Sequence, residues 1–248
     1  MSGSVFLLVH GGWHGGWCWR RVADRLRALG HRVFTPTLTG MGEREHLFTP
    51  EVGLHTHVQD VLAVLRFEQL SDVVLVGHSY GGAIITQVAD RDPAVLRALV
   101  YVDAIIPEHD QPGWDGFPPE RQQAMQRGAQ TLGGVRVPPP DPAIWGITDP
   151  DDLAWARACV TPHPIRTMFD APVVTGRWQE VPRKHYVLAG AHQGPRFVAH
   201  HAAVSNQPGW TTAVIDGGHD LMVTHPEALT HELLAAAGVA KLPSARRV

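Results

Sequence analysis

Val73-Val74-Leu75-Val76-Gly77-His78-Ser79-Tyr80-Gly81-Gly82 is the stretch that decides the fold of this chain. Apolar, mostly β-branched residues run directly into a Gly-x-Ser-x-Gly motif, and a helix-compatible segment, 83–89, follows at once. The motif alone is common by chance, but here a buried strand precedes it and a helix follows. That context is typical of a nucleophile elbow, a strained turn that lifts a serine hydroxyl above the sheet. We therefore expect Ser79 to be a nucleophile; the alternative is a glycine-rich connection with an incidental serine.

Length, charge and cysteine content narrow the class of protein. A chain of 248 residues is long enough for one large α/β domain with its own core. The formal net charge of −3 gives no electrostatic basis for a nucleic-acid partner. Two distant cysteines, Cys18 and Cys159, do not suit a disulfide framework or a cysteine-rich zinc site. The sequence predicts neither a signal peptide nor a membrane span, so we expect a cytoplasmic protein without a membrane partner.

Short apolar runs alternate with amphipathic helical stretches on both sides of the elbow. This alternation predicts an α/β fold, a mainly parallel sheet of about six strands with helices on both faces. The expected strands are residues 5–9, 32–35, 73–76, 96–103, 185–189 and 211–216, and the expected helices are residues 17–29, 57–70, 83–89, 196–204 and 226–237.

The alternation breaks in a segment rich in proline, glycine and tryptophan. Segments of this length inside a compact domain are usually functional or have structure of their own. We interpret residues 107–182 as an inserted cap, and residues 1–106 and 183–248 as the two parts of the core.

Four tryptophans are the expected substrate-binding residues. Trp13 lies in the glycine-rich segment after the first expected strand, and Trp114, Trp145 and Trp155 belong to the cap. If they face inward, they make a largely apolar pocket, which favours a small hydrophobic or aromatic ester as substrate. The alternative is that the cap tryptophans pack together as the cap's own core.

A base and an oxyanion hole are expected at the same edge of the sheet as Ser79. Gly217-Gly218-His219 directly follows the last predicted strand, and ligands of open α/β sheets bind along the carboxyl edge. His219 is therefore the expected general base. After the first strand, His10-Gly11-Gly12-Trp13 lets the backbone approach a substrate closely. The amides of Gly12 and Tyr80 are the expected oxyanion donors.

These motifs together resemble the α/β-hydrolases, particularly the branch that contains plant methylesterases and hydroxynitrile lyases. The resemblance rests on the segments around His10–Trp17, Gly77–Gly82 and Gly217–His219, and it spans nearly the whole chain. The chain also resembles bacterial esterase-like proteins that carry Thr39-Gly40-Met41-Gly42-Glu43-Arg44. The resemblance implies catalytic roles for Ser79 and His219 and oxyanion donors at Gly12 and Tyr80. Hydroxynitrile lyases carry a lysine directly after the catalytic histidine. Asp220 stands there in this chain, which disfavours cyanohydrin cleavage.

The third member of the triad departs from the family's pattern. The family usually places an aspartate just after the penultimate strand, but Leu188–Gly194 holds no carboxylate and has His192 about there. A histidine cannot supply the negative charge that stabilises an imidazolium. Asp103, at the end of the strand after the elbow helix, is the expected substitute, with a turn-capping or arginine-pairing role as the alternative. Asp216 and Asp220 are weaker candidates.

The sequence thus predicts a serine hydrolase that cleaves a carboxylic ester through an acyl-enzyme, without a cofactor or a metal. A thioesterase, a lactonase, or a biosynthetic lyase or cyclase on the same scaffold stays open. So does a small-molecule binding protein with little turnover, and a homodimer is among the open assemblies.

Overall fold

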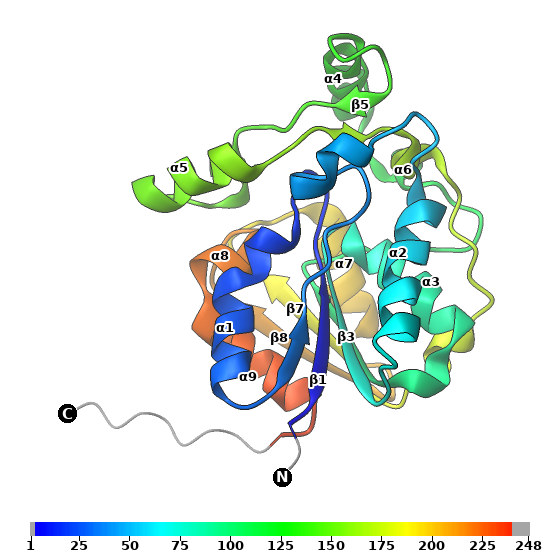
Figure 1. Ribbon diagram of the computed structural model, residues 1–248, viewed down its shortest axis with the longest axis vertical. Helices are drawn as coiled ribbons and strands as arrows, with labels where there is room; N and C mark the ends of the chain where they lie inside the picture. Colours follow the sequence, from blue (N-terminus) through cyan, green and yellow to red (C-terminus); the bar gives the residue numbers. More distant parts are fainter. Residues whose placement is uncertain (1–2, 240–248) are drawn as a thin grey trace.

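A parallel sheet forms the centre of the molecule (Figure 1). The computed structural model describes residues 3–239, so residues 1–2 and 240–248 of the predicted core lie outside the described residues. The six strands pair in parallel in the order β2-β1-β3-β4-β7-β8. They are β1 (Val5–Val9), β2 (Arg32–Phe34), β3 (Val73–His78), β4 (Leu96–Val102), β7 (Lys184–Ala189) and β8 (Trp210–Ile215). The predicted fold class is confirmed.

Helices cover both faces of this sheet because side chains alternate along each strand. Phe6 and Leu8 of β1 face one cluster, in which α1, α8 and α9 pack, while Leu7 and Val9 face a second cluster with α2 and α3. The helices outside the 107–182 segment are α1 (Arg20–Ala28), α2 (Leu54–Phe67), α3 (Gly81–Arg91), α7 (Pro195–Val204), α8 (Leu221–Thr224) and α9 (Pro226–Ala236), with short 3₁₀ turns η1 (Gly16–Trp19), η2 (Gly42–Leu47) and η3 (Pro93–Val95). No helix among the described residues is both long enough and apolar enough to cross a bilayer.

The start of α2 shows how a distant residue sets a helix boundary. Hydrophobic spacing predicts a helix from residue 57, but the helix begins at Leu54. The Leu54 amide donates to Asp170 Oδ2 at 2.9 Å, and Thr56 Oγ1 accepts from the Gly53 amide at 3.3 Å. Free N–H groups at a helix start need such acceptors. One of these acceptors comes from a residue far along the chain, which periodicity does not detect.

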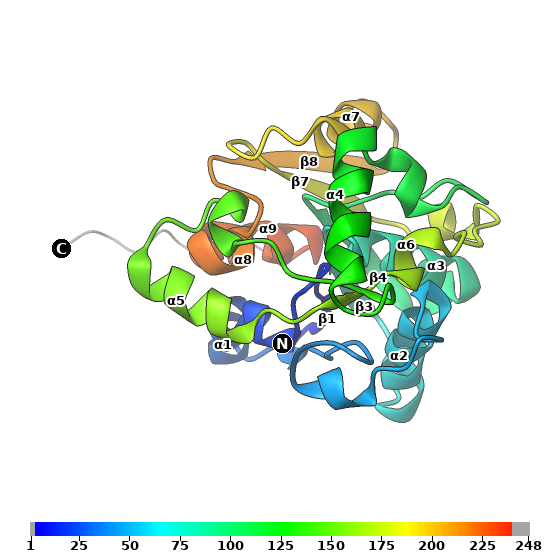
Figure 2. The ribbon, with the colours of Figure 1, turned by 90° about the horizontal axis from the view of Figure 1, so that it is seen from above.

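Most of residues 107–182 lies over the carboxyl ends of the strands, and α4 crosses above them (Figures 1 and 2). Residues 173–180 instead run back along α3, where the amides of Thr175 and Trp178 donate to Asp90. The elements of residues 107–182 are η4 (Gly113–Gly116), α4 (Pro119–Gln130), β5 (Arg136–Val137), η5 (Pro142–Trp145), α5 (Pro150–Cys159), β6 (His163–Pro164), α6 (Arg166–Phe169) and η6 (Arg177–Glu180). Strands β5 and β6 form a separate antiparallel pair, and Trp114, Met125 and Met168 belong to a separate small core. The carboxyl edge of the main sheet and this layer together line a cavity.

Candidate active site

Ser79 sits on the strained turn that the sequence predicts between β3 and α3. Its φ is +53°, a left-handed conformation that non-glycine residues rarely adopt. The turn is held on both sides, because the Ser79 amide donates to Val102 O at 3.2 Å and its carbonyl accepts from Ile105 N at 3.0 Å. A Cβ on Gly77 would lie 2.7 Å from Gly81 O, so a larger residue does not fit there. The strain and the tight packing expose Ser79 to the cavity above the sheet.

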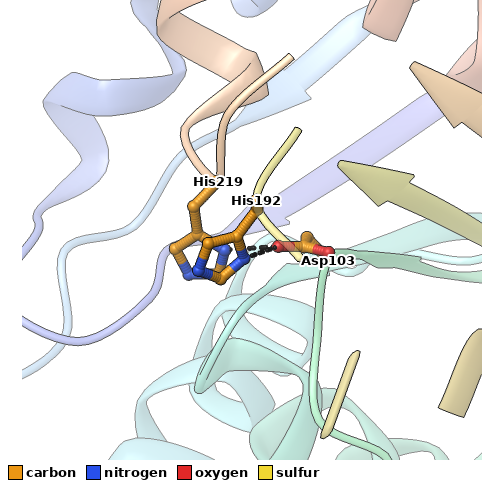
Figure 3. Close-up of side chains that lie close together, drawn as sticks. All are labelled: Asp103, His192 and His219. Atoms are coloured by element: carbon orange, nitrogen blue, oxygen red, sulfur yellow. Dashed lines mark hydrogen bonds and ion pairs between the residues drawn. The ribbon is translucent and has the colours of Figure 1, made fainter. Parts of the chain in front are cut away.

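Asp103 and His219 meet where the sequence expects a carboxylate and a base to meet. Asp103 follows β4 with a φ of +41° and is fully buried, and its amide donates to Val187 O at 2.7 Å. Its Oδ2 lies 2.6 Å from His219 Nδ1 (Figure 3). Parallel strands end at one edge, so residues 116 positions apart come together there. His219 and Ser79 line the same cavity.

The same carboxylate oxygen also contacts His192, in the loop after β7. His192 Nδ1 lies 2.6 Å from Asp103 Oδ2, and Ala189 N donates to Oδ1 at 3.2 Å. Burial raises the pKa of a carboxyl, but the hydrogen bonds from His192 and His219 outweigh burial and lower the pKa of Asp103. A carboxylate only accepts hydrogen bonds, so each ring donates from Nδ1. Both histidines are thereby fixed in one tautomer.

The three side chains Asp103, His192 and His219 also have the composition of a metal site. In a tetrahedral zinc site, ligands about 2.0 to 2.1 Å from the ion lie roughly 3.3 Å from each other. The contacts of both Nδ1 atoms with Asp103 are 2.6 Å, which is shorter than that separation and fits hydrogen bonds. The geometry therefore describes a hydrogen-bonded cluster.

Two histidines bind the backbone carbonyls of the loop after β1. His10 Nδ1 contacts Gly11 O at 2.8 Å, and His14 Nδ1 contacts Gly12 O at 2.6 Å. Burial lowers the pKa of His10 to about 3, so this ring is neutral. A Cβ on Gly11 would lie 2.9 Å from Ser79 Cβ, so glycine is required for this close approach. Gly12 and Tyr80, the expected oxyanion donors, line the cavity beside Ser79.

A second buried carboxylate, Asp220, contacts a histidine of this loop. Asp220 Oδ2 lies 3.0 Å from His14 Nε2, and Asp220 Oδ1 lies 3.8 Å from His78 Nε2. Burial lowers the pKa of a histidine, but the charge and hydrogen bond of Asp220 raise that of His14. His78 donates from Nε2 to His219 O at 3.1 Å. Asp220 is a weak triad candidate by sequence. In the structure it connects the His219 loop to the loop of Gly12 through His14.

The cavity has a volume of about 480 Å³ and a mostly apolar lining. Trp13 and Trp145 line it, as expected. The other two predicted substrate-binding tryptophans do not, and that expectation is corrected. Trp114 belongs to the small core of residues 107–182 and contacts Phe169 in a tilted arrangement (ring centroids 4.6 Å apart). Trp155 packs against Trp17 outside the cavity (5.1 Å).

Two cavity residues are absent from the site that the sequence predicts. One is His192, which the sequence shows only at the position of the family's usual aspartate. The other is His163 of β6, which is buried against Trp13 and Tyr80, with ring centroids 5.5 and 5.1 Å away. Burial lowers the pKa of His163 well below its usual value, so it is neutral. His192 directly follows a strand at the functional edge, and that position was the available signal.

Comparisons with known proteins agree with this fold. The model of the alpha/beta hydrolase family matches residues 6–232. A carbendazim hydrolyzing esterase from Nocardioides is 38% identical, over 93% of this chain and 98% of that protein. Methylesterase 10 of Arabidopsis thaliana is 24% identical, over 92% and 90%. An extracellular alpha/beta-hydrolase structure from Paenibacillus superposes with a TM-score of 0.82 at 23% identity, over 94% and 98% of the two chains.

The chain belongs to the alpha/beta hydrolase family. This chain covers nearly the whole length of the Nocardioides esterase and of methylesterase 10, and it is a carboxylic ester hydrolase.

Proposed function

We propose that Ser79, His219 and Asp103 form the catalytic triad of a serine esterase. The observation that carries this proposal is the 2.6 Å contact of His219 with a fully buried Asp103, in the cavity that Ser79 enters from a strained turn. A serine hydroxyl needs an adjacent base, and that base needs an orienting anion.

The reaction follows from these positions. Ser79 Oγ attacks the ester carbonyl and His219 Nε2 takes its proton, while Asp103 stabilises the resulting imidazolium. The Gly12 and Tyr80 amides bind the oxyanion. His219 then protonates the leaving alcohol, and water later releases the acid from the acyl-enzyme.

The substrate of this proposal is a small hydrophobic or aromatic ester. Trp13, Trp145 and Phe197 are among the rings that line the cavity, and residues 107–182 act as the cap over it. The name of the Nocardioides relative gives carbendazim as its substrate, so carbendazim is the first substrate to assay. The nearly complete coverage of that relative supports the choice.

Ser79→Ala tests the proposal. With short p-nitrophenyl esters and with carbendazim, kcat/KM should fall by at least about 10⁴-fold, and a fluorophosphonate should label wild type alone. Unchanged kcat/KM would overturn the serine mechanism. Labelling without turnover would indicate a binding protein, and product analysis separates hydrolysis from a lyase or cyclase reaction.

A cytoplasmic location and the absence of nucleic-acid and membrane partners also belong to the proposal. Both cysteines are free thiols, which fits a reducing compartment. Cell fractionation tests the location, and sedimentation tests whether the chain forms a homodimer.

A further inference from the structure

His192 is a second histidine with a fixed tautomer beside the proposed general base. Its Nδ1 is bound to Asp103, and its ring lies 4.3 Å from the His219 ring, centroid to centroid, with a 38° tilt. Phe197 packs against both rings, at 5.4 and 5.1 Å, and keeps them side by side. The His192 side chain is 21% exposed and that of His219 is 7% exposed, and both residues line the cavity.

The His192 and His219 rings each have a free Nε2 atom, and both residues line the cavity. Since both Nδ1 atoms donate to one carboxylate oxygen, each neutral ring has a lone pair on Nε2. Figure 3 shows the two Nε2 atoms on the side of the rings away from Asp103. One water molecule that donates two hydrogen bonds of about 2.9 Å at a near-tetrahedral angle joins acceptors roughly 4.6 Å apart. The centroids of the two rings are 4.3 Å apart, a separation of the same order as that span.

We propose that His192 is a positioning residue that holds the hydrolytic water of the second half-reaction. The inference rests on the proposed acyl-enzyme. The water donates one hydrogen to His192 Nε2 and the other to His219 Nε2. Its oxygen bonds to the acyl carbon as His219 takes the second proton. The bond between that carbon and Ser79 Oγ then breaks, and Oγ receives this proton from His219. The hydrogen held by His192 stays with the acid product.

This role separates the two half-reactions. During acylation the nucleophile is Ser79 and needs only His219, so His192 makes no contribution beyond its hydrogen bond to Asp103. During deacylation the nucleophile is a free water molecule, which gains from being held in line.

His192→Asn is the matched variant. Asparagine keeps an N–H group that can donate to Asp103 and lacks the acceptor at the Nε2 position. With a p-nitrophenyl ester, whose good leaving group makes acylation fast, we expect kcat to fall by about 10²-fold. KM should fall in parallel and kcat/KM should stay within about threefold, with a burst of p-nitrophenol and an acyl adduct on Ser79 by mass spectrometry. His192→Gln, whose amide oxygen reaches the Nε2 position, should recover part of kcat.

Other outcomes overturn the inference. An equal fall of kcat and kcat/KM would mean that His192 supports Asp103 in both half-reactions. Wild-type kinetics in His192→Asn would mean that the water needs no second acceptor. Loss of the proposed function has a different signature, because wild type would then form no adduct on Ser79.

Discussion

Two buried aspartates of this chain each lie beside two histidines, and the two clusters differ in what the histidines face. Asp103 contacts His192 and His219, which are open to the cavity. Asp220 contacts His14 and lies near His78, whose side chains have almost no exposed surface. Both carboxylates are fully buried. In the proposed mechanism the first cluster serves proton transfer, whereas the same residue types in the second cluster connect two loops.

Hydrogen bonding separates the clusters further. Both oxygens of Asp103 accept hydrogen bonds, whereas Asp220 Oδ1 and His78 Nδ1 are buried without a hydrogen-bond partner among the described residues. An unpaired buried polar atom costs stability. The unpaired atoms of the Asp220 cluster therefore lower the stability of the fold locally. The same cluster joins the loop of His219 to the loop of Gly12 through His14.

The largest expected effect is a difference in kcat between variants of the two aspartates. Asp103→Asn should lower kcat by about 10⁴-fold, since an amide neither stabilises the imidazolium nor fixes its tautomer. Asp220→Asn should lower kcat by less than about tenfold, since the amide oxygen still accepts from His14. Steady-state kinetics on one p-nitrophenyl ester measures both variants. Similar losses in the two would remove the distinction between the clusters.

Unfolding free energy should show the structural role of Asp220. Asp220→Ala leaves His14 buried without its partner, and breaking such a pair costs about 3 to 5 kcal/mol. Asp24→Ala, which removes an exposed pair with Arg27 (3.5 Å), is the control and should leave the unfolding free energy nearly unchanged. Urea unfolding followed by tryptophan fluorescence measures both. If Asp220→Ala unfolded like Asp24→Ala, the buried pair would have no positioning role.

The contrast also shows what the sequence could and could not predict. The strands, the elbow and the meeting of Asp103 with His219 were predictable, because parallel strands place their ends at one edge. The use of Asp220 was not, since it depends on His14, 206 positions away, which donates from Nε2 to the Asp220 carboxylate in a buried contact. The positions of Trp114 and Trp155 were equally hidden, because no periodic pattern in residues 107–182 indicates which rings pack together.

The smallest expected effect is the pH dependence that His14 gives to stability. Its pKa is raised in the folded protein above the value of 6.5 for a free histidine, because Asp220 outweighs burial. Protonated His14 therefore stabilises the fold fully below pH 6.5, and this contribution disappears as the pH rises through the folded pKa.

Neutral buried histidines act in the opposite direction. Burial lowers the pKa of His10 to about 3, so its contribution is lost as the pH falls below 6.5. The difference in unfolding free energy between wild type and His14→Gln isolates the His14 contribution. That difference should shrink steadily as the pH is raised from 6 to 9. A difference independent of pH would mean that His14 is neutral in the fold, and that the Asp220 cluster is a hydrogen-bonded pair without a buried positive charge.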